Sequence, residues 1–183
     1  AQPAKAMSSS ETIAATTNTF FPFFRLSKDQ DPLSAVKPAM IPGVTEKLPG
    51  RADPNATLAV ILPHFPAAID SGRTGFNNID PDKDGIVREY GLYRDDYGWK
   101  IPSLALSVGR ALGYSVPDTP NVLINWRGKP FTYRYVTFSE VLLDMTSREK
   151  KRPENEFEGK IVIIGSTAPS LFDLKATPIA RIY

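Results

Sequence analysis

Residues 160–165 read Lys-Ile-Val-Ile-Ile-Gly, a continuous apolar segment that limits the folds open to this chain. A strand whose successive side chains are all apolar and β-branched is typical of a sheet that is covered on both faces. Residues 122–126 form a second short apolar segment, and a helical pattern at residues 137–148 lies between the two. The sequence therefore predicts a strand, a helix and a strand in that order.

The helix at residues 137–148 has clear local signals. Thr137 and Glu140 have the spacing of a capping box. The apolar positions of the helix fall on one stripe, which consists of Phe138, Val141, Leu142 and Met145. If the two flanking strands are neighbours in one sheet, the helical crossover makes the strands parallel, and the connection between them is right-handed. We therefore expect an α/β fold with a partly parallel sheet and a crossover over about residues 122–165.

An antiparallel hairpin is predicted over about residues 75–93. Two apolar stretches flank the sequence Asp-Pro-Asp-Lys-Asp-Gly at residues 80–85, in which Asp84 and Gly85 suit a tight turn. Because the turn residues follow one apolar stretch and precede the next, the two stretches are expected to pair.

A further helix is predicted at residues 101–112, where apolar side chains recur at helical spacing. Pro102 suits the first turn of this helix, and Gly113 suits the position after its last residue. Both signals place the helix directly after the predicted hairpin.

The N-terminal half is expected to be long and irregular. Residues 20–24 hold four phenylalanines around Pro22, which favours a core-filling edge strand because proline in strands is tolerated mainly at edges. Residues 28–55 carry five prolines and predict a long loop region. Residues 1–19 are small and polar and are expected to be partly mobile.

Composition excludes several classes of site. The 183 residues include no cysteine and only one histidine, which rules out a thiolate nucleophile, a cysteine metal site and a site with two histidines. The net charge of +2 argues against nucleic acid as a partner. The length fits one domain, and the chain opens without methionine, so we expect a piece of a longer protein.

Asp80, Asp82 and Asp84 alternate ahead of Gly85, as in the first half of a calcium loop. The helix–loop–helix form of that loop needs a bidentate acid at its twelfth position, which here is Gly91. A polar hairpin turn is therefore the favoured interpretation, and no metal is expected. Calcium at these three carboxylates is the alternative.

Ser166 and Thr167 follow the predicted strand at residues 160–165, at the end where α/β sheets bind ligands. With Asp173 further along the loop, they are the candidate residues for an anion or a small polar ligand. There is no G-x-G-x-x-G motif and no P-loop lysine, so hydroxyls that cap a strand exit remain the alternative. Asp173 is more simply explained as a residue that orders this loop.

No catalytic residues are predicted. A Ser–His–Asp triad would have to use His64, and no G-x-S-x-G sequence supplies its nucleophile. The basic residues at 148–152 follow a predicted helix, where cations complement the helix dipole.

The motifs in their order resemble the second type of CHASE domain. The resemblance covers about residues 75–178 and rests on Gly75, Asp82-Lys-Asp84-Gly85-Ile-Val-Arg88, Pro102-Ser-Leu-Ala-Leu106, Ile124-Asn-Trp-Arg-Gly128, Thr137-Phe-Ser-Glu-Val-Leu142, Phe157-Glu-Gly-Lys-Ile-Val-Ile-Ile-Gly-Ser-Thr-Ala168, Asp173 and Thr177-Pro178.

The resemblance implies an extracytoplasmic, periplasmic sensor domain of a bacterial transmembrane receptor. Such a domain binds an unknown small molecule or an extracytoplasmic protein, without a cofactor. It is not itself an enzyme, and it regulates a cytoplasmic effector such as an adenylate cyclase, a histidine kinase or another kinase through the parent's membrane helices. The family pattern implies that residues 1–183 are a single sensory domain truncated at both ends. An exposed sheet edge would favour a homodimer.

Two other function classes stay open at this point. The first is an α/β enzyme of hydrolase type, in which Ser166 or Thr167 would act with His64. The second is a cation-stabilised binding module built around the carboxylates of Asp80, Asp82 and Asp84.

Overall fold

The structure is a computed structural model that describes residues 8–41, 43–44, 46–128, 132–166 and 175–179. The chain divides into two compact units. Unit 1 comprises Ala1–Asp80 and Glu89–Ile124, and unit 2 comprises Pro81–Arg88 and Asn125–Tyr183. The fold is mixed α/β with small sheets and few helices, which confirms the predicted fold class.

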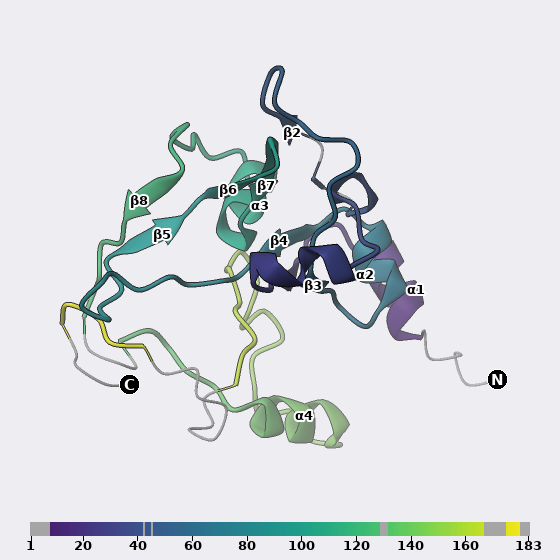
Figure 1. The fold of residues 1–183 in the computed structure, drawn as a ribbon. Coiled ribbons are helices and arrows are strands. Elements are labelled where there is room, and N and C mark those ends of the chain that lie inside the picture. Colours follow the sequence, from purple (N-terminus) through teal and green to yellow (C-terminus); the bar gives the residue numbers. More distant parts are fainter. Residues whose placement is uncertain (1–7, 42, 45, 129–131, 167–174, 180–183) are drawn as a thin grey trace. The chain divides into compact units, whose positions relative to one another are not determined.

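Unit 1 holds most of the regular structure (Figure 1). Its elements are α1 (Ser9–Ala15), β1 (Phe21–Arg25), the 3-10 helices η1 (Lys28–Leu33) and η2 (Pro38–Met40), β2 (Glu46–Lys47), β3 (Val60–Ile61), α2 (Pro66–Asp70), β4 (Thr74–Phe76), β5 (Glu89–Gly91), β6 (Tyr93–Asp96), β7 (Trp99–Pro102), α3 (Leu104–Ala111) and β8 (Asn121–Leu123). In the described part of unit 2 the one helix is α4 (Phe138–Thr146).

The described residues of unit 1 form three small sheets. The first has the order β3-β1-β4 and is mixed, because β1 is antiparallel to β3 and parallel to β4. The second has the order β2-β7-β6 and is antiparallel, and the third pairs β5 with β8. A partly parallel sheet is therefore present, but its parallel strands are β1 and β4, and not the strands predicted within residues 122–165.

The phenylalanine-rich segment forms a central strand, so the predicted edge position is wrong. Phe21 donates its amide to the Arg73 carbonyl on the β4 side, at 2.9 Å. Because neighbouring residues of a strand point their amides to opposite sides, the missing N–H of Pro22 faces the β3 side. β3 pairs with β1 only at Phe24 and Arg25, so no partner strand needs that donor.

The hairpin predicted at residues 75–93 does not form as one unit. β4 pairs with β1, β5 pairs with β8, and the observed hairpin joins β6 and β7. The predicted tight turn does form, since the Asp82 amide donates to the Ile86 carbonyl at 3.0 Å and Gly85 has φ +80°. A turn fixes only its nearest residues, and the flanking strands found other partners.

The helix predicted at residues 101–112 begins later, at Leu104. The preceding residues belong to β7, and the Ser103 hydroxyl accepts the Leu106 amide at 3.2 Å, which caps α3. Gly113 follows the helix with φ +74°, the left-handed conformation predicted for it.

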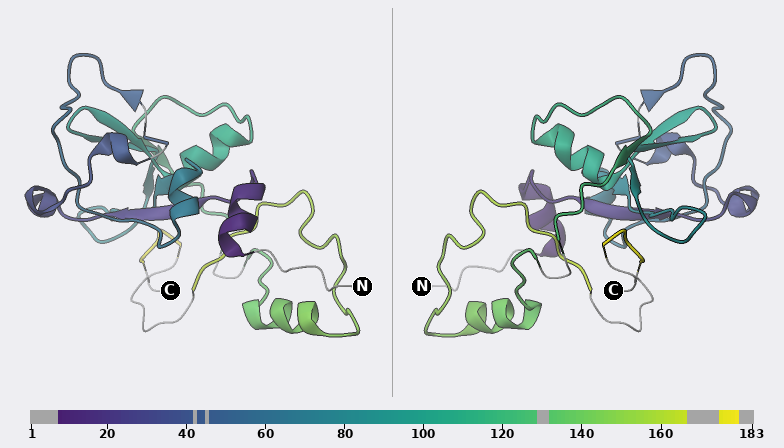
Figure 2. Two further views of the ribbon diagram at one scale, coloured as in Figure 1. Left: turned by 90° about the vertical axis from the view of Figure 1, so that its right-hand side faces the viewer. Right: turned by 90° about the vertical axis from the view of Figure 1, so that its left-hand side faces the viewer.

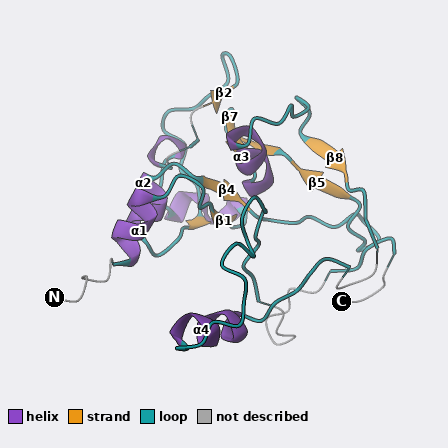
Figure 3. Cartoon of the chain, turned by 180° about the vertical axis from the view of Figure 1, so that it is seen from behind, coloured by secondary structure: helices purple, strands orange, loops and turns teal. Residues whose placement is uncertain are grey.

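The crossover predicted over residues 122–165 is also wrong. α4 forms with the predicted capping box between Thr137 and Glu140. However, residues 160–166 form no strand, and β8 is antiparallel to β5. Apart from α4, the described part of unit 2 is drawn as loop and turn (Figure 3). Strand propensity reflects packing on neighbouring strands, so an apolar segment without such neighbours does not form a strand by itself.

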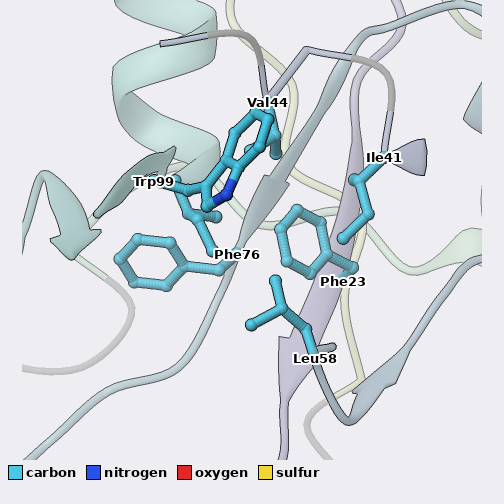
Figure 4. Close-up of a cluster of buried hydrophobic side chains, with 7 residues drawn as sticks. Phe23, Ile41, Val44, Leu58, Phe76 and Trp99 are labelled. Carbon is cyan, nitrogen blue, oxygen red and sulfur yellow. The ribbon is translucent and has the colours of Figure 1, made fainter. Parts of the chain in front are cut away.

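The hydrophobic core lies in unit 1 and fixes the strands that carry the residues described below. Figure 4 shows the ring of Phe23 among neighbouring apolar side chains. The core residues are Phe23, Ile41, Val44, Leu58, Phe76, Trp99 and Ile101. The region predicted as a long loop, residues 28–55, contributes two of them, while its described residues form only η1, η2 and β2. α1, within the segment expected to be partly mobile, packs against α2 (Figure 2).

Candidate functional site

A buried ion cluster in unit 1 is the strongest concentration of charge in the interior. It consists of Arg25, Asp31 and Asp96, whose residues are at most 5% exposed. Arg25 ends β1, Asp31 lies in η1, and Asp96 ends β6. η1 follows β1 closely in the sequence, whereas Asp96 lies 71 positions from Arg25, so the fold brings one cation and two carboxylates together.

Arg25 holds the cluster together through a fork of hydrogen bonds. Its Nη1 and Nη2 atoms donate to Oδ1 and Oδ2 of Asp31 at 2.7 and 2.5 Å. Its Nε atom donates to Asp96 Oδ2 at 3.1 Å, and Nη1 also reaches the Ala59 carbonyl at 3.0 Å. Such bidentate, charge-assisted bonds fix both the distance and the orientation of their partners.

Asp31 accepts two further hydrogen bonds, from the Ala59 amide at 2.7 Å and from the Tyr97 hydroxyl at 2.8 Å. Burial by itself would raise the pKa of Asp31, but the hydrogen bonds from Arg25, Ala59 and Tyr97 outweigh it and lower the pKa below its usual range. The same bond raises the pKa of Tyr97. Asp31 is therefore held as a carboxylate.

Tyr97 reaches this cluster from a turn in which its backbone is strained. It has φ +55° and is the non-glycine residue with positive φ among the described residues. Left-handed backbone costs an L-residue about 1–2 kcal/mol. The hydrogen bond to Asp31 offsets part of this cost and ties the β6–β7 hairpin to η1.

Asp96 connects the cluster to the surface. Its Oδ1 atom is buried and accepts no hydrogen bond from the described residues, although Lys28 Nζ lies 3.4 Å away. The side chain of Lys28 is 60% exposed. A substitution of Lys28, or a ligand that binds its ammonium group, would therefore alter the ion pair of a buried carboxylate.

Reasoning from the sequence missed this cluster, although one signal was available. Phe21, Phe23 and Arg25 occupy alternate positions of β1 and so share one face. An arginine on the same face as a buried phenylalanine requires carboxylates nearby. Nothing local to Asp31 or Asp96 identifies them as those partners.

The acidic residues of the predicted calcium loop are engaged in ion pairs. In unit 1, Arg94 Nη1 lies 3.3 Å from Asp80 Oδ2. In unit 2, Arg88 donates to Asp82 Oδ2 at 2.6 Å and to Asp84 Oδ2 at 2.8 Å. The Arg88 bond lowers the pKa of Asp84 to about 2.

No group of three or more acidic or histidine side chains within the described ranges could hold a metal ion. The Asp84 carboxylate also accepts the Ile86 amide at 3.1 Å, which supports the turn. The calcium alternative stays untested, and in this structure Arg88 pairs with Asp82 and Asp84 while Arg94 pairs with Asp80.

The other predicted site residues are distributed over both units. Ser166 is exposed in unit 2, and His64 is exposed in unit 1. Thr167 and Asp173 lie outside the described residues. The proposed ligand loop and the alternative triad therefore stay predictions.

The basic residues after α4 take the role predicted for them. Lys150 Nζ donates to the carbonyls of Asp144 and Met145 at 2.8 and 2.5 Å, at the C-terminal end of the helix. Arg152 donates to both carboxylate oxygens of the buried Glu156 at 2.6 Å. These bonds order the segment that follows α4.

Unit 1 also has a shallow cavity of about 290 Å³ between α1 and α2, lined by Ala14, Ala67, Asp70, Ser71 and Arg73. Arg73 is anchored there, because it donates to the carbonyls of Thr19 and Ile13 at 2.9 and 2.8 Å. One anchored cation, one carboxylate and an apolar floor suit a small polar molecule.

The chain was compared with protein families, curated proteins and solved structures. Residues 4–183 match the protein family described as the CHASE2 domain. Comparisons with curated proteins and with solved structures give no match. Among the described helices, none has the length and apolar character needed to cross a membrane.

Proposed function

Because the chain belongs to the CHASE2 domain family, which consists of extracytoplasmic sensory domains, we propose that it is the input domain of a bacterial transmembrane receptor. It binds a signal on the extracytoplasmic side and regulates a cytoplasmic output such as an adenylate cyclase or a protein kinase. The family match over residues 4–183 carries this proposal. The chemistry of the output belongs to the parent protein.

A sensor needs two conformations that bind its signal with different affinity. The buried ion cluster supports such a role because it joins β1, η1 and the β6–β7 hairpin through a few directional bonds. Movement of the hairpin would break the Tyr97 bond and relax its strained backbone. The hairpin is therefore our candidate for the element that changes position.

Two places could accept a small polar signal. One is the cavity between α1 and α2, which combines Asp70 with Arg73. The other is the loop with Ser166, Thr167 and Asp173, which was predicted from the sequence. No cofactor is proposed for either place.

Topology is the first test. In the parent reading frame, alkaline phosphatase or β-galactosidase is fused directly after residue 183, and both enzyme activities are measured in cells. Alkaline phosphatase folds only outside the cytoplasm, so we expect an active phosphatase fusion and an inactive galactosidase fusion. The opposite pattern would contradict the proposal.

Signal transmission is the second test. The Tyr97→Phe variant of the full-length receptor removes the bond to Asp31 and is expected to change the basal output. Tyr114→Phe is the matched control, since Tyr114 is exposed in unit 1 and its hydroxyl makes no hydrogen bond to another described residue. Equal output from the wild type and both variants would remove the hairpin from the mechanism.

A further inference from the structure

Unit 2 presents its apolar side chains outward. Within its described residues, Val87 is the one hydrophobic side chain that is fully buried. Twelve large apolar residues of this unit are exposed: Tyr133, Tyr135, Phe138, Leu142, Leu143, Met145, Phe157, Ile161, Val162, Ile163, Ile164 and Ile179. A surface with this much apolar area is typical of an interaction site.

The most exposed part is continuous in the sequence. Residues 161–164, here called the exposed apolar segment, are 63%, 51%, 90% and 83% exposed. Their backbone groups make no hydrogen bond to another backbone group within the described ranges. The side chains of this segment are therefore exposed, and among the described residues its peptide groups have no backbone partner.

We propose that the exposed apolar segment pairs with the same segment of a second copy, as two antiparallel strands related by a two-fold axis. Addition of a strand satisfies the peptide groups, and the alternating side chains supply apolar contacts. A two-fold interface requires a surface that complements itself. Four consecutive β-branched residues without a charge meet that requirement.

The segment lacks the features that normally protect a sheet edge. Lysine and proline commonly block such edges. Residues 161–165 contain neither, and the Lys160 ammonium is turned to the Glu156 carbonyl of its own unit. A side chain added at Gly165 would meet nothing within 4 Å, so the end of the segment is open as well.

Charge favours a second copy over a membrane or a nucleic acid. Residues 133–164 contain six Lys or Arg and six Asp or Glu, so the region has no net charge to attract an anionic partner. Area sets the expected strength of the pairing. A standard interface needs about 800 Å² from each partner, and the four residues of the segment supply only part of that, so we expect a weak dimer.

The test is the mass of the 183-residue chain in solution, measured by sedimentation velocity over a concentration series up to about 100 μM, the range of weak specific complexes. We expect a concentration-dependent dimer. Ile163→Lys places a charge at the most exposed position of the segment and should weaken dimerisation at least roughly tenfold, with an unchanged circular dichroism spectrum. The matched control is Leu33→Lys, since Leu33 is 87% exposed in unit 1, and this variant should dimerise like the wild type.

A second pair of variants tests the strand geometry. Ile164→Pro removes a backbone donor, whereas Ile164→Leu keeps the donor and the apolar character. Because neighbouring residues of a strand point their N–H groups to opposite sides, Ile163→Pro is measured as well. Strand pairing predicts that at least one of the two proline variants is monomeric while Ile164→Leu dimerises, and normal dimerisation of both proline variants would overturn it.

Three other results would overturn the proposal. They are a wild type that stays monomeric at the highest concentration, an Ile163→Lys variant that dimerises normally, and binding of monomeric wild type to phosphatidylglycerol vesicles. These measurements use the isolated chain, so their failure leaves the sensor proposal standing.

Discussion

Arg25 shows how one residue can organise a small interior. Its guanidinium donates to Asp31, Asp96 and two backbone carbonyls, and it thereby links β1 to η1 and β6. A buried ion pair adds little net stability compared with an apolar replacement, but removal of one partner leaves an uncompensated charge. The main effect of the cluster is therefore to specify that β1, η1 and β6 pack together, and its contribution to net stability is small.

Arg25→Gln is expected to destabilise unit 1 strongly, because Asp31 and Asp96 would keep their charges without the guanidinium. Loss of one partner of a buried pair costs about 3–5 kcal/mol. Urea denaturation followed by tryptophan fluorescence measures the free energy of unfolding, since Trp99 lies in the core. The control is Arg51→Gln, which removes an exposed pair with Asp95 and should cost less than about 1 kcal/mol. Equal losses would show that burial does not matter here.

Acid should weaken the same cluster. The folded-state pKa of Asp31 is lowered, so its contribution to stability is complete above its unfolded value of about 4. This contribution is lost as the pH falls through the folded-state pKa. Urea midpoints measured between neutral pH and about pH 3 should therefore fall at the acid end. Asp31→Asn should be less stable at neutral pH but should lose less on acidification, and an equal acid loss would argue against Asp31.

At the level of elements, close backbone contact decides how β4 and α3 pack. A Cβ atom at Gly75 would lie 2.4 Å from the Leu104 amide nitrogen, at the start of α3. Phe76 also forms a parallel bridge with Ser103, the residue that caps α3. Glycine at position 75 therefore allows the strand to run directly beneath the first turn of the helix.

Gly75→Ala should cost about 1–3 kcal/mol or more, the usual effect of overpacking against rigid atoms. Gly165→Ala is the matched control, because a Cβ atom there meets nothing within 4 Å. Both free energies of unfolding are measured by urea denaturation at low protein concentration. A Gly75 variant as stable as the control would show that β4 and α3 can separate freely.

The capping box of α4 gives a second prediction for an element. The Thr137 hydroxyl accepts the Glu140 amide at 3.3 Å, and the Glu140 carboxylate accepts the Thr137 amide at 3.0 Å. Thr137→Ala should lower the free energy needed to open the helix by about 1 kcal/mol. Amide hydrogen exchange at the first turn of α4 measures it. Ser139→Ala, two residues further on, removes the hydroxyl that donates to the Thr137 hydroxyl at 3.3 Å but leaves both capping-box bonds, so its effect should be smaller. Equally fast exchange in both variants would point to a general loss of the helix.

At the level of the whole molecule, the two units differ in how they are stabilised. All seven residues of the hydrophobic core belong to unit 1. Unit 2 is ordered within its described residues mainly by polar contacts, such as those of Arg152 with Glu156. Stability in proteins varies with the local density of buried contacts, so the units should open independently.

Hydrogen exchange over the whole chain tests this difference. At a protein concentration below that of dimer formation, amides of β1 and β7 should exchange slowly, and those of α4 and residues 161–166 should exchange rapidly. Raised concentration should protect residues 161–166 selectively if they pair between copies. Equal protection of both units at low concentration would contradict the difference.

The sequence by itself determined the features that depend on a few neighbouring residues. The Thr137–Glu140 capping box, the left-handed Gly113 and the tight turn at Gly85 all form as predicted, and the α/β class is confirmed. Each of these depends on interactions within one or two turns of chain, and the identities of the residues specify them.

Only the tertiary structure decided which strands pair and which charges meet. β1 pairs with β3 and β4, although the local signals predicted that residues 75–79 pair with 86–93. Arg25 forms an ion pair with Asp96, which lies 71 positions away in the sequence. The apolar residues 161–164 stayed exposed despite their strand propensity. The physical reason is that strand pairing and ion pairing depend on which partner the rest of the fold brings within reach, and no local pattern encodes that partner.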